Sequence, residues 1–393
     1  MKFHILTAIT SAIAITQYVF AAPTQTISEA TTSTTTYMPQ VSPIFPSMAP
    51  ATDVVTSYNA GPYNLSAALP TYQLSGYPEV WQVPNVTHPE VVAAINQINW
   101  DLVPKAPVRY QNPKTGLFEP DTDGPTDPYC WWSDTNCLHP KIKTLPADYY
   151  KCDQPDMWGL SYDDGPFNRY TGKYASLENP YAEPALYNFL AEHNNQKANL
   201  MYIGSNVVSY PAAAKRGFND GHYLCVHTWS HPPMTTMTND EAVAEFYWTL
   251  KAIKETTGVT LKCWRPPQGD VDDRIRAIAW QMGLHTVMWN WDSEDWDMPA
   301  PGGGDLSPTV VNSYFEQWYA DGKAHNLTVG HIVLEHELNS QTVGMTEKWL
   351  PKLQTVFNVI PALACNNVSQ PYWEKQFVYP LVNQPAQNGT LKY

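Results

Sequence analysis

The feature that most constrains the fold of this chain is an alternation of short apolar runs with helical patterns, which begins at Cys152. Strands and helices that alternate at this spacing predict parallel strands joined by helical crossovers. About seven such units, fewer than the eight of a regular barrel, predict an α/β fold built as a distorted (β/α) barrel. The expected strands are 157–162, 198–203, 223–227, 260–264, 286–291 and 331–334, and the expected helices are 185–194, 206–218, 239–256, 272–282, 309–321 and 346–359.

The remaining segments differ from this core in composition. Residues 1–21 combine Lys2, an apolar run and a small-residue cleavage site, which is typical of a secretory signal peptide. Residues 22–50 are rich in Ser, Thr and Pro and predict a linker or a pro-segment. Residues 51–150 carry many Pro, Tyr and Trp with little periodicity, so we expect an irregular extension packed on a core at 151–365, which a tail at 366–393 follows.

Composition and charge restrict the class of protein. The chain is 43% hydrophobic and 15% charged, so a sizeable folded core is expected. Its net charge of −14 argues against nucleic acid or an anionic membrane as partner. Beyond the signal no apolar stretch is long enough to span a bilayer, so no membrane anchor is expected. We expect a monomer that is secreted to the periplasmic space or the cell wall.

Export also predicts disulfides and glycans. Six Cys in an oxidising compartment allow 15 connectivities. Three pairs are within reach in the expected fold: Cys130 with Cys137, Cys152 with Cys365, and Cys225 with Cys263, the last of them bridged or free. The sequons expected to carry glycans are Asn64, Asn85, Asn326, Asn367 and Asn388.

Polar side chains follow the expected strands at their C-terminal ends, where barrels of this kind carry their chemistry. Asp163 and Asp164 end the first strand, and successive strand residues point to opposite sides, so the two carboxylates are expected to play different parts. His227 and His231 follow the third strand, at a spacing that lets two imidazoles meet on one helical turn. Two His and one carboxylate form a standard catalytic zinc set, which Asp164 would complete.

Each of these groups also has a purely structural interpretation. Asp-Asp-Gly-Pro is an ordinary turn sequence. After the later strands, Arg265 suits an ion pair, Trp296 a core aromatic, and His336 a capped core histidine. Polar groups at the ends of five of the six expected strands nevertheless favour a single site.

In this order, five segments resemble the motifs of the polysaccharide deacetylase family, the metal-dependent carbohydrate esterases that include chitin and peptidoglycan deacetylases. The resemblance covers about 152–365, and the sequences of the motifs are most similar to those of the fungal chitin deacetylases. The segments are Ser-Tyr-Asp-Asp-Gly-Pro from Ser161, His-Thr-x-x-His from His227, Arg-x-Pro-x-Gly from Arg265, Asp-Ser-x-Asp-Trp from Asp292 and Leu-x-His from Leu334.

The resemblance implies a role for each residue. Asp164, His227 and His231 would bind one divalent metal ion, with Zn²⁺ expected and Co²⁺ as the alternative. Asp163 would act as general base, and Arg265 would keep its carboxylate ionised and oriented.

The resemblance further implies that His336 protonates the departing amine and that Asp292 is the partner of His336. The backbone N–H of Gln268 would help to hold the oxyanion. The remaining substrate contacts are expected from Trp296, Leu334 and Tyr162.

One position departs from the family pattern, which usually has an aromatic residue, commonly Tyr, where this chain has Gln268. The expected activity is removal of N-acetyl groups from the N-acetylglucosamine units of chitin or chitin oligosaccharides, which gives chitosan and acetate. The alternatives are a deacetylase of peptidoglycan or acetylxylan, and a chitin-binding wall protein with weak activity.

Overall fold

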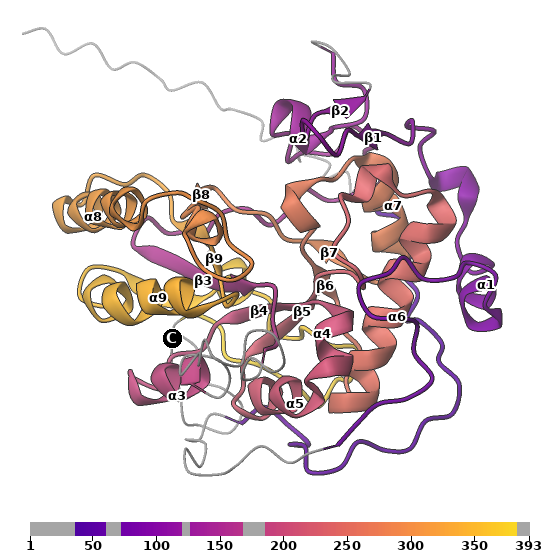
Figure 1. Ribbon diagram of the computed structural model, residues 1–393, viewed down its shortest axis with the longest axis horizontal. Coiled ribbons are helices and arrows are strands. Elements are labelled where there is room, and N and C mark those ends of the chain that lie inside the picture. Colours follow the sequence, from indigo (N-terminus) through magenta and orange to yellow (C-terminus); the bar gives the residue numbers. More distant parts are fainter. Residues whose placement is uncertain (1–35, 60–71, 120–125, 168–184, 383–393) are drawn as a thin grey trace, which may run out of the picture. The chain divides into compact units, whose positions relative to one another are not determined.

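The computed structural model describes residues 36–59, 72–119, 126–167 and 185–382, which all fall in the unit Thr36–Tyr393 (Figure 1). The expected signal peptide and the sequons at Asn64 and Asn388 lie outside the described residues. Among the helices of the described chain, none combines the length and the apolar character that a bilayer span requires.

An eight-stranded sheet forms the centre of the fold, in the order β7-β6-β5-β4-β3-β9-β8 with β10 also paired to β3. All its ladders are parallel, which confirms the predicted distorted barrel of parallel strands. The strands are β3 (Met157–Asp163), β4 (Asn199–Tyr202), β5 (Tyr223–Val226), β6 (Cys263–Trp264), β7 (His285–Thr286), β8 (Trp291–Asp292), β9 (His331–His336) and β10 (Asn358–Pro361).

Strand β3 is buried along its whole length and has partner strands on both edges. On one edge it pairs with β9, from Trp158 to Asp163. On the other edge it pairs with β10 through its first half and with β4 through its second half. A strand covered in this way is apolar except at its end, so its carboxylates emerge where the ladder stops.

Helices cover the sheet, with α8 beside α9 and α6 beside α7 (Figure 1). Helix α6 begins with a capping box between Thr238 and Glu241 and ends at the left-handed Gly258. The helices are α3 (Ala185–Glu192), α4 (Gly204–Ser209), α5 (Pro211–Asn219), α6 (Asn239–Thr257), α7 (Asp273–Gln281), α8 (Pro308–Ala324) and α9 (Ser340–Leu353).

Three predicted elements were wrong in detail. The helix expected at 206–218 is two helices, because Pro211 cannot continue the ladder of α4. The strand expected at 286–291 is two short strands, and between them the carbonyls of Val287 and Met288 accept hydrogen bonds from Arg265. The last helix ends at Leu353, and the apolar residues that follow form β10, since a short apolar run suits a strand as well as a helix.

Residues of the N-terminal extension form short elements that pack on the core through buried ion pairs. Arg109 lies 2.9 Å from Asp272, and Asp148 lies 2.7 Å from Arg276, with all four side chains almost fully buried. The elements are α1 (Pro89–Ile95), a 3₁₀ turn (Trp100–Leu102), β1 (Tyr110–Gln111), β2 (Phe118–Glu119) and α2 (Trp132–Thr135).

Disulfides join all three expected pairs: Cys130 with Cys137, Cys152 with Cys365, and Cys225 with Cys263. The last pair links β5 to β6. Each of its cysteines lies two residues before a predicted site residue, His227 or Arg265, so the bridge fixes the spacing of the two strand ends.

Candidate active site

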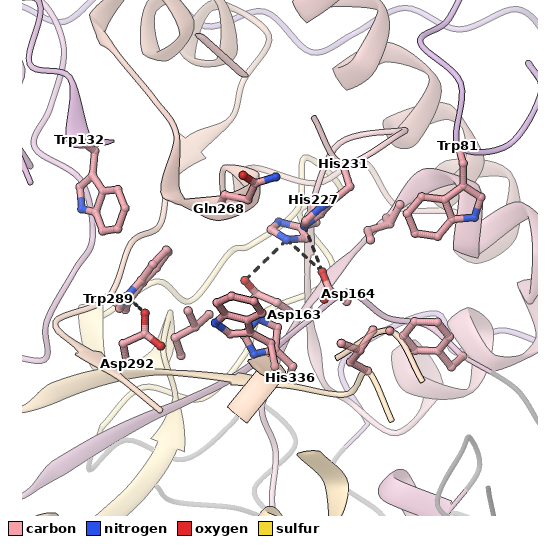
Figure 2. A pocket seen from close by; sticks show the side chains of 16 residues that line it. Trp81, Trp132, Asp163, Asp164, His227, His231, Gln268, Trp289, Asp292 and His336 are labelled. Carbon is pink, nitrogen blue, oxygen red and sulfur yellow. Dashed lines mark hydrogen bonds and ion pairs between the residues drawn. The ribbon is translucent and has the colours of Figure 1, made fainter. Parts of the chain in front are cut away.

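A pocket of about 640 Å³ lies at the C-terminal ends of β3, β5, β6 and β9. Figure 2 shows its side chains arranged around a central group of two carboxylates and two imidazoles. The lining residues come from both the sheet and the extension: Trp81, Trp132, Asp163, Asp164, Phe167, Ile203, His227, His231, Gln268, Trp289, Asp292, Trp296, Gly302, Leu334, His336 and Leu338.

Asp164, His227 and His231 form a cluster in which the three potential ligand atoms lie within 4.8 Å of one another. Asp164 Oδ1 is 3.2 Å from His231 Nε2 and 3.5 Å from His227 Nε2. The predicted helical turn between the two His is wrong. A loop with left-handed residues at Thr228 (φ 64°) and His231 (φ 60°) brings the rings together instead, with their centroids 4.9 Å apart.

Glu245 of α6 binds the loop that carries the two His. The carboxylate of Glu245 accepts hydrogen bonds from the backbone N–H of Trp229 (2.7 Å) and of Ser230 (2.8 Å). It also accepts one from Ser230 Oγ at 2.6 Å. Burial raises the pKa of Glu245 to about 7, although these donors act in the opposite direction. Three donors to one buried carboxyl group hold the loop in its irregular conformation.

The donor set of this cluster fits a divalent metal ion. His227 Nδ1 lies 2.8 Å from the carbonyl oxygen of Arg265, a contact that in a metal-bound site would place the proton on Nδ1 and leave the lone pair of Nε2 for the ion. Burial opposes ionisation of Asp164, but the imidazoles of His231 and His227 hold its pKa well below the usual range. An ionised carboxylate and two imidazole nitrogens that face one another are ligands that zinc-type sites use.

Asp163 lies beside this cluster and is held by a buried guanidinium. Arg265 Nη1 donates to Asp163 Oδ1 at 2.6 Å and to Ser161 Oγ at 2.9 Å, and Arg265 has no exposed surface. The second carboxylate oxygen of Asp163 is 3.7 Å from His227 Nε2. One oxygen is therefore bound by Arg265, while the other faces the cluster in the pocket.

His336 lies at the end of β9, and its partner is Asp295 instead of the predicted Asp292. Asp295 Oδ1 is 2.6 Å from His336 Nδ1, and Asp295 Oδ2 accepts the His336 backbone N–H at 3.0 Å. Asp292 accepts from Trp289 Nε1 and from the backbone N–H of Glu294. Asp292 lies in β8, where it pairs with Leu334 of β9. Asp295 begins the 3₁₀ turn Asp295–Asp297, and this turn places its carboxylate next to His336 at the end of β9.

The charge of His336 follows from this pairing. Burial disfavours the imidazolium, but the carboxylate of Asp295, with smaller contributions from Asp164 and Asp163, raises the pKa of His336 to about 10. At neutral pH the imidazole is protonated and can serve as a proton donor.

Three of the four predicted substrate contacts line the pocket, and one does not. Gln268, Trp296 and Leu334 are in the lining. The prediction for Tyr162 was wrong, because its side chain is completely buried and points to the side of β3 opposite to Asp163. Gln268 has a left-handed backbone (φ 56°) inside the 3₁₀ turn Pro267–Gly269.

Sequence reasoning missed several residues of the pocket wall. Asp295 stands three residues after Asp292 in the same motif, so the motif itself offered a second carboxylate. Trp81 and Trp132 come from the extension, where no periodicity marks an element. Trp289, Phe167 and Ile203 also line the pocket and read in the sequence as ordinary core residues.

The sequence of the chain is similar to those of known proteins. Residues 150–287 match the polysaccharide deacetylase family. The chain is 38% identical over 335 residues to a chitin deacetylase of Amylomyces rouxii, an alignment that covers 84% of this chain and 75% of the relative. It is 37% identical over 340 residues to chitin deacetylase 2 of Cryptococcus neoformans var. grubii, which covers 85% of this chain and 70% of the relative. The chain belongs to the polysaccharide deacetylase family.

Proposed function

We propose that this protein removes N-acetyl groups from the N-acetylglucosamine units of chitin, and that Asp164, His227 and His231 bind one Zn²⁺ for this reaction. The observation that carries the proposal is the position of two side chains in one pocket with the triad: Asp163, which Arg265 binds, and His336, which pairs with Asp295. The names of the two relatives supply the substrate, chitin.

The reaction needs a proton acceptor for water and a proton donor for the nitrogen that leaves. Asp163 accepts the proton of the attacking water, because Arg265 binds its other oxygen and keeps the carboxylate oriented. His336 then donates a proton to the amine, since an amide nitrogen leaves poorly without one. A divalent ion held by the triad would supply Lewis acidity to the acetamide carbonyl and to the attacking water.

The other polar groups complete this arrangement. The backbone N–H of Gln268 donates to the oxyanion, and its left-handed conformation holds the peptide at the pocket. Trp296 and Leu334 form the apolar slot for the acetyl methyl group. Three disulfides fit a protein that acts outside the cell, and we propose that it is secreted to the periplasmic space or the cell wall.

Acetate release tests the proposal. The purified protein is incubated with chitin oligomers, peptidoglycan and acetylxylan, each with a chelator and after the return of Zn²⁺ or Co²⁺. We expect chitin oligomers to release acetate, the chelator to stop the release, and Zn²⁺ to restore it. The Asp163→Asn variant is the matched control for contaminating esterases.

Three outcomes contradict parts of the proposal separately. Faster release from peptidoglycan or acetylxylan would change the substrate. Release that a chelator leaves unchanged would refute the metal. Tight chitin binding without release would favour a wall protein that binds the polymer.

A further inference from the structure

The pocket contains an aromatic side chain that the proposed reaction does not use. Trp81 of the extension lines the pocket and is 46% exposed. The other tryptophans without an assigned role are less available, since Trp289 is 8% exposed and Trp132 packs against it with ring centroids 5.0 Å apart. Figure 2 shows the Trp81 indole on the side of Asp164 and His231, far from Trp132.

The backbone of Trp81 is held in an unfavourable conformation. Its φ of 65° is left-handed, a region that bulky L-residues rarely adopt. The backbone N–H of Trp81 donates to Ser205 Oγ at 2.8 Å, and the N–H of Gln82 closes a turn onto the Glu79 carbonyl. Strain of this kind persists where neighbouring contacts impose it, and it gathers at ligand sites.

The same segment is attached to the loop that carries the metal ligands. Trp229, between His227 and His231, donates its indole N–H to the Glu79 carbonyl at 3.2 Å. Its ring lies nearly parallel to the ring of Tyr77, with centroids 6.0 Å apart. Ser205 Oγ joins both segments, because it also donates to the Trp229 carbonyl at 2.6 Å. The position of Trp81 relative to the triad is therefore fixed.

We propose that Trp81 is a binding platform for the sugar unit that lies beside the unit being deacetylated. The inference rests on the proposed function. A β-linked pyranose ring offers a flat face of C–H groups, which packs on an indole, while its equatorial hydroxyl and acetamido groups stay in water. The unit that Trp81 binds is a neutral N-acetylglucosamine residue on the side of His231, one position along the polymer from the reacting acetamide.

The dependence of the rate on the length of the oligosaccharide distinguishes a sugar-binding role of Trp81 from a purely structural one. We expect Trp81→Ala to lower kcat/KM on the hexamer of N-acetylglucosamine by about tenfold, mainly through KM, because an aromatic contact contributes on this order. N-acetylglucosamine itself should change by less than about twofold, since it has no neighbouring unit. Trp81→Tyr should keep most of the preference for long oligomers.

The control is Val83→Ala, in the same segment at a residue that is 44% exposed and is not part of the pocket lining. This variant should match the wild type on every oligomer. An equal loss on N-acetylglucosamine and on the hexamer in Trp81→Ala, or no loss on either, would overturn the inference.

A binding measurement keeps this test separate from the proposed function. Calorimetric titration of the hexamer into Asp163→Asn, and into the same variant with Trp81→Ala, reports affinity without turnover. If the wild type releases no acetate but Trp81→Ala weakens binding about tenfold, the proposed reaction fails and the platform stands. If affinity is unchanged by Trp81→Ala, the platform fails whether or not the protein is active.

Discussion

The strand ends and the N-terminal extension both line the pocket, but they are built differently. Asp163, Arg265 and His336 lie at or directly after buried parallel strands, and each is bound by a neighbouring part of the core. Trp81 belongs to a segment of turns and short helices, which ion pairs and single hydrogen bonds attach to the core.

This difference suggests a division of labour. Proton transfer requires side chains placed within fractions of an ångström, and strand ends in a ladder provide that precision. Contact with a polymer tolerates more variation, and irregular segments can change without disturbing the sheet. We therefore expect strand-end substitutions to lower the rate on every oligomer alike, and extension substitutions to act according to oligomer length.

The largest effect is expected from His231→Ala, which removes one ligand of the triad. The purified variant should contain little metal and lose on the order of 10⁴-fold or more in kcat on all oligomers. Elemental analysis and acetate release measure the two quantities. A full equivalent of metal in this variant would refute the ligand set, and a loss confined to long oligomers would break the division between the two regions.

Substitution of the acid or the base is expected to have the next largest effect. Asp163→Asn and His336→Ala should each lower kcat roughly 10² to 10⁴-fold while the metal content stays near one equivalent. The acidic limb of the rate profile should disappear with Asp163 and the basic limb with His336. Circular dichroism controls for folding, because Asp163→Asn leaves Arg265 buried without its anion. A near-native rate in either variant would show that its assigned role is wrong.

Asp295→Asn should change the pH dependence more than the maximum rate. Without the Asp295 carboxylate the pKa of His336 falls from about 10, so the basic limb moves to lower pH. Above the new pKa the activity should drop by roughly tenfold for each further pH unit. Asp292→Asn is the matched control, since Asp292 makes no hydrogen bond to His336. A shift of the basic limb in Asp292→Asn alone would restore the original assignment.

The same pairing predicts how stability depends on pH. The pKa of His336 is higher in the folded state than its unfolded value of about 6.5, so its stabilising contribution is complete below that pH. The contribution is lost as the pH rises through about 10. The difference in Tm between the wild type and Asp295→Asn should therefore be largest near pH 6 and shrink toward pH 10.

The smallest effect is expected from Gln268→Tyr. The oxyanion donor is a backbone N–H, so a change of side chain leaves it in place as long as the turn keeps its shape. The change in kcat/KM on chitin oligomers should stay well below the roughly 10² to 10³-fold that loss of the donor would cause. An inert wild type and an active Tyr variant would show that the native chain is a degenerate enzyme.

The alternating pattern was sufficient to predict the fold, because parallel strands with helical crossovers leave a strong periodic signal. The triad was predicted from His spacing and the position of Asp164, although the loop between the His is not helical. The Asp295 partner was missed because spacing alone cannot show which carboxylate a 3₁₀ turn brings back to His336. Trp81 was missed because a left-handed turn held by distant side chains has no local sequence pattern.

The bond between Cys152 and Cys365 makes the core a covalent ring, since every strand of the large sheet lies between the two cysteines, 213 residues apart. The extension and the C-terminal tail leave this ring as two branches. In the chain-entropy model, a closed loop of this length favours the folded state by about 5 kcal/mol. A protease that cuts one peptide bond inside the ring leaves the two pieces joined by the disulfide. On a denaturing gel the cut protein should therefore migrate as one band without reductant and as two bands with it.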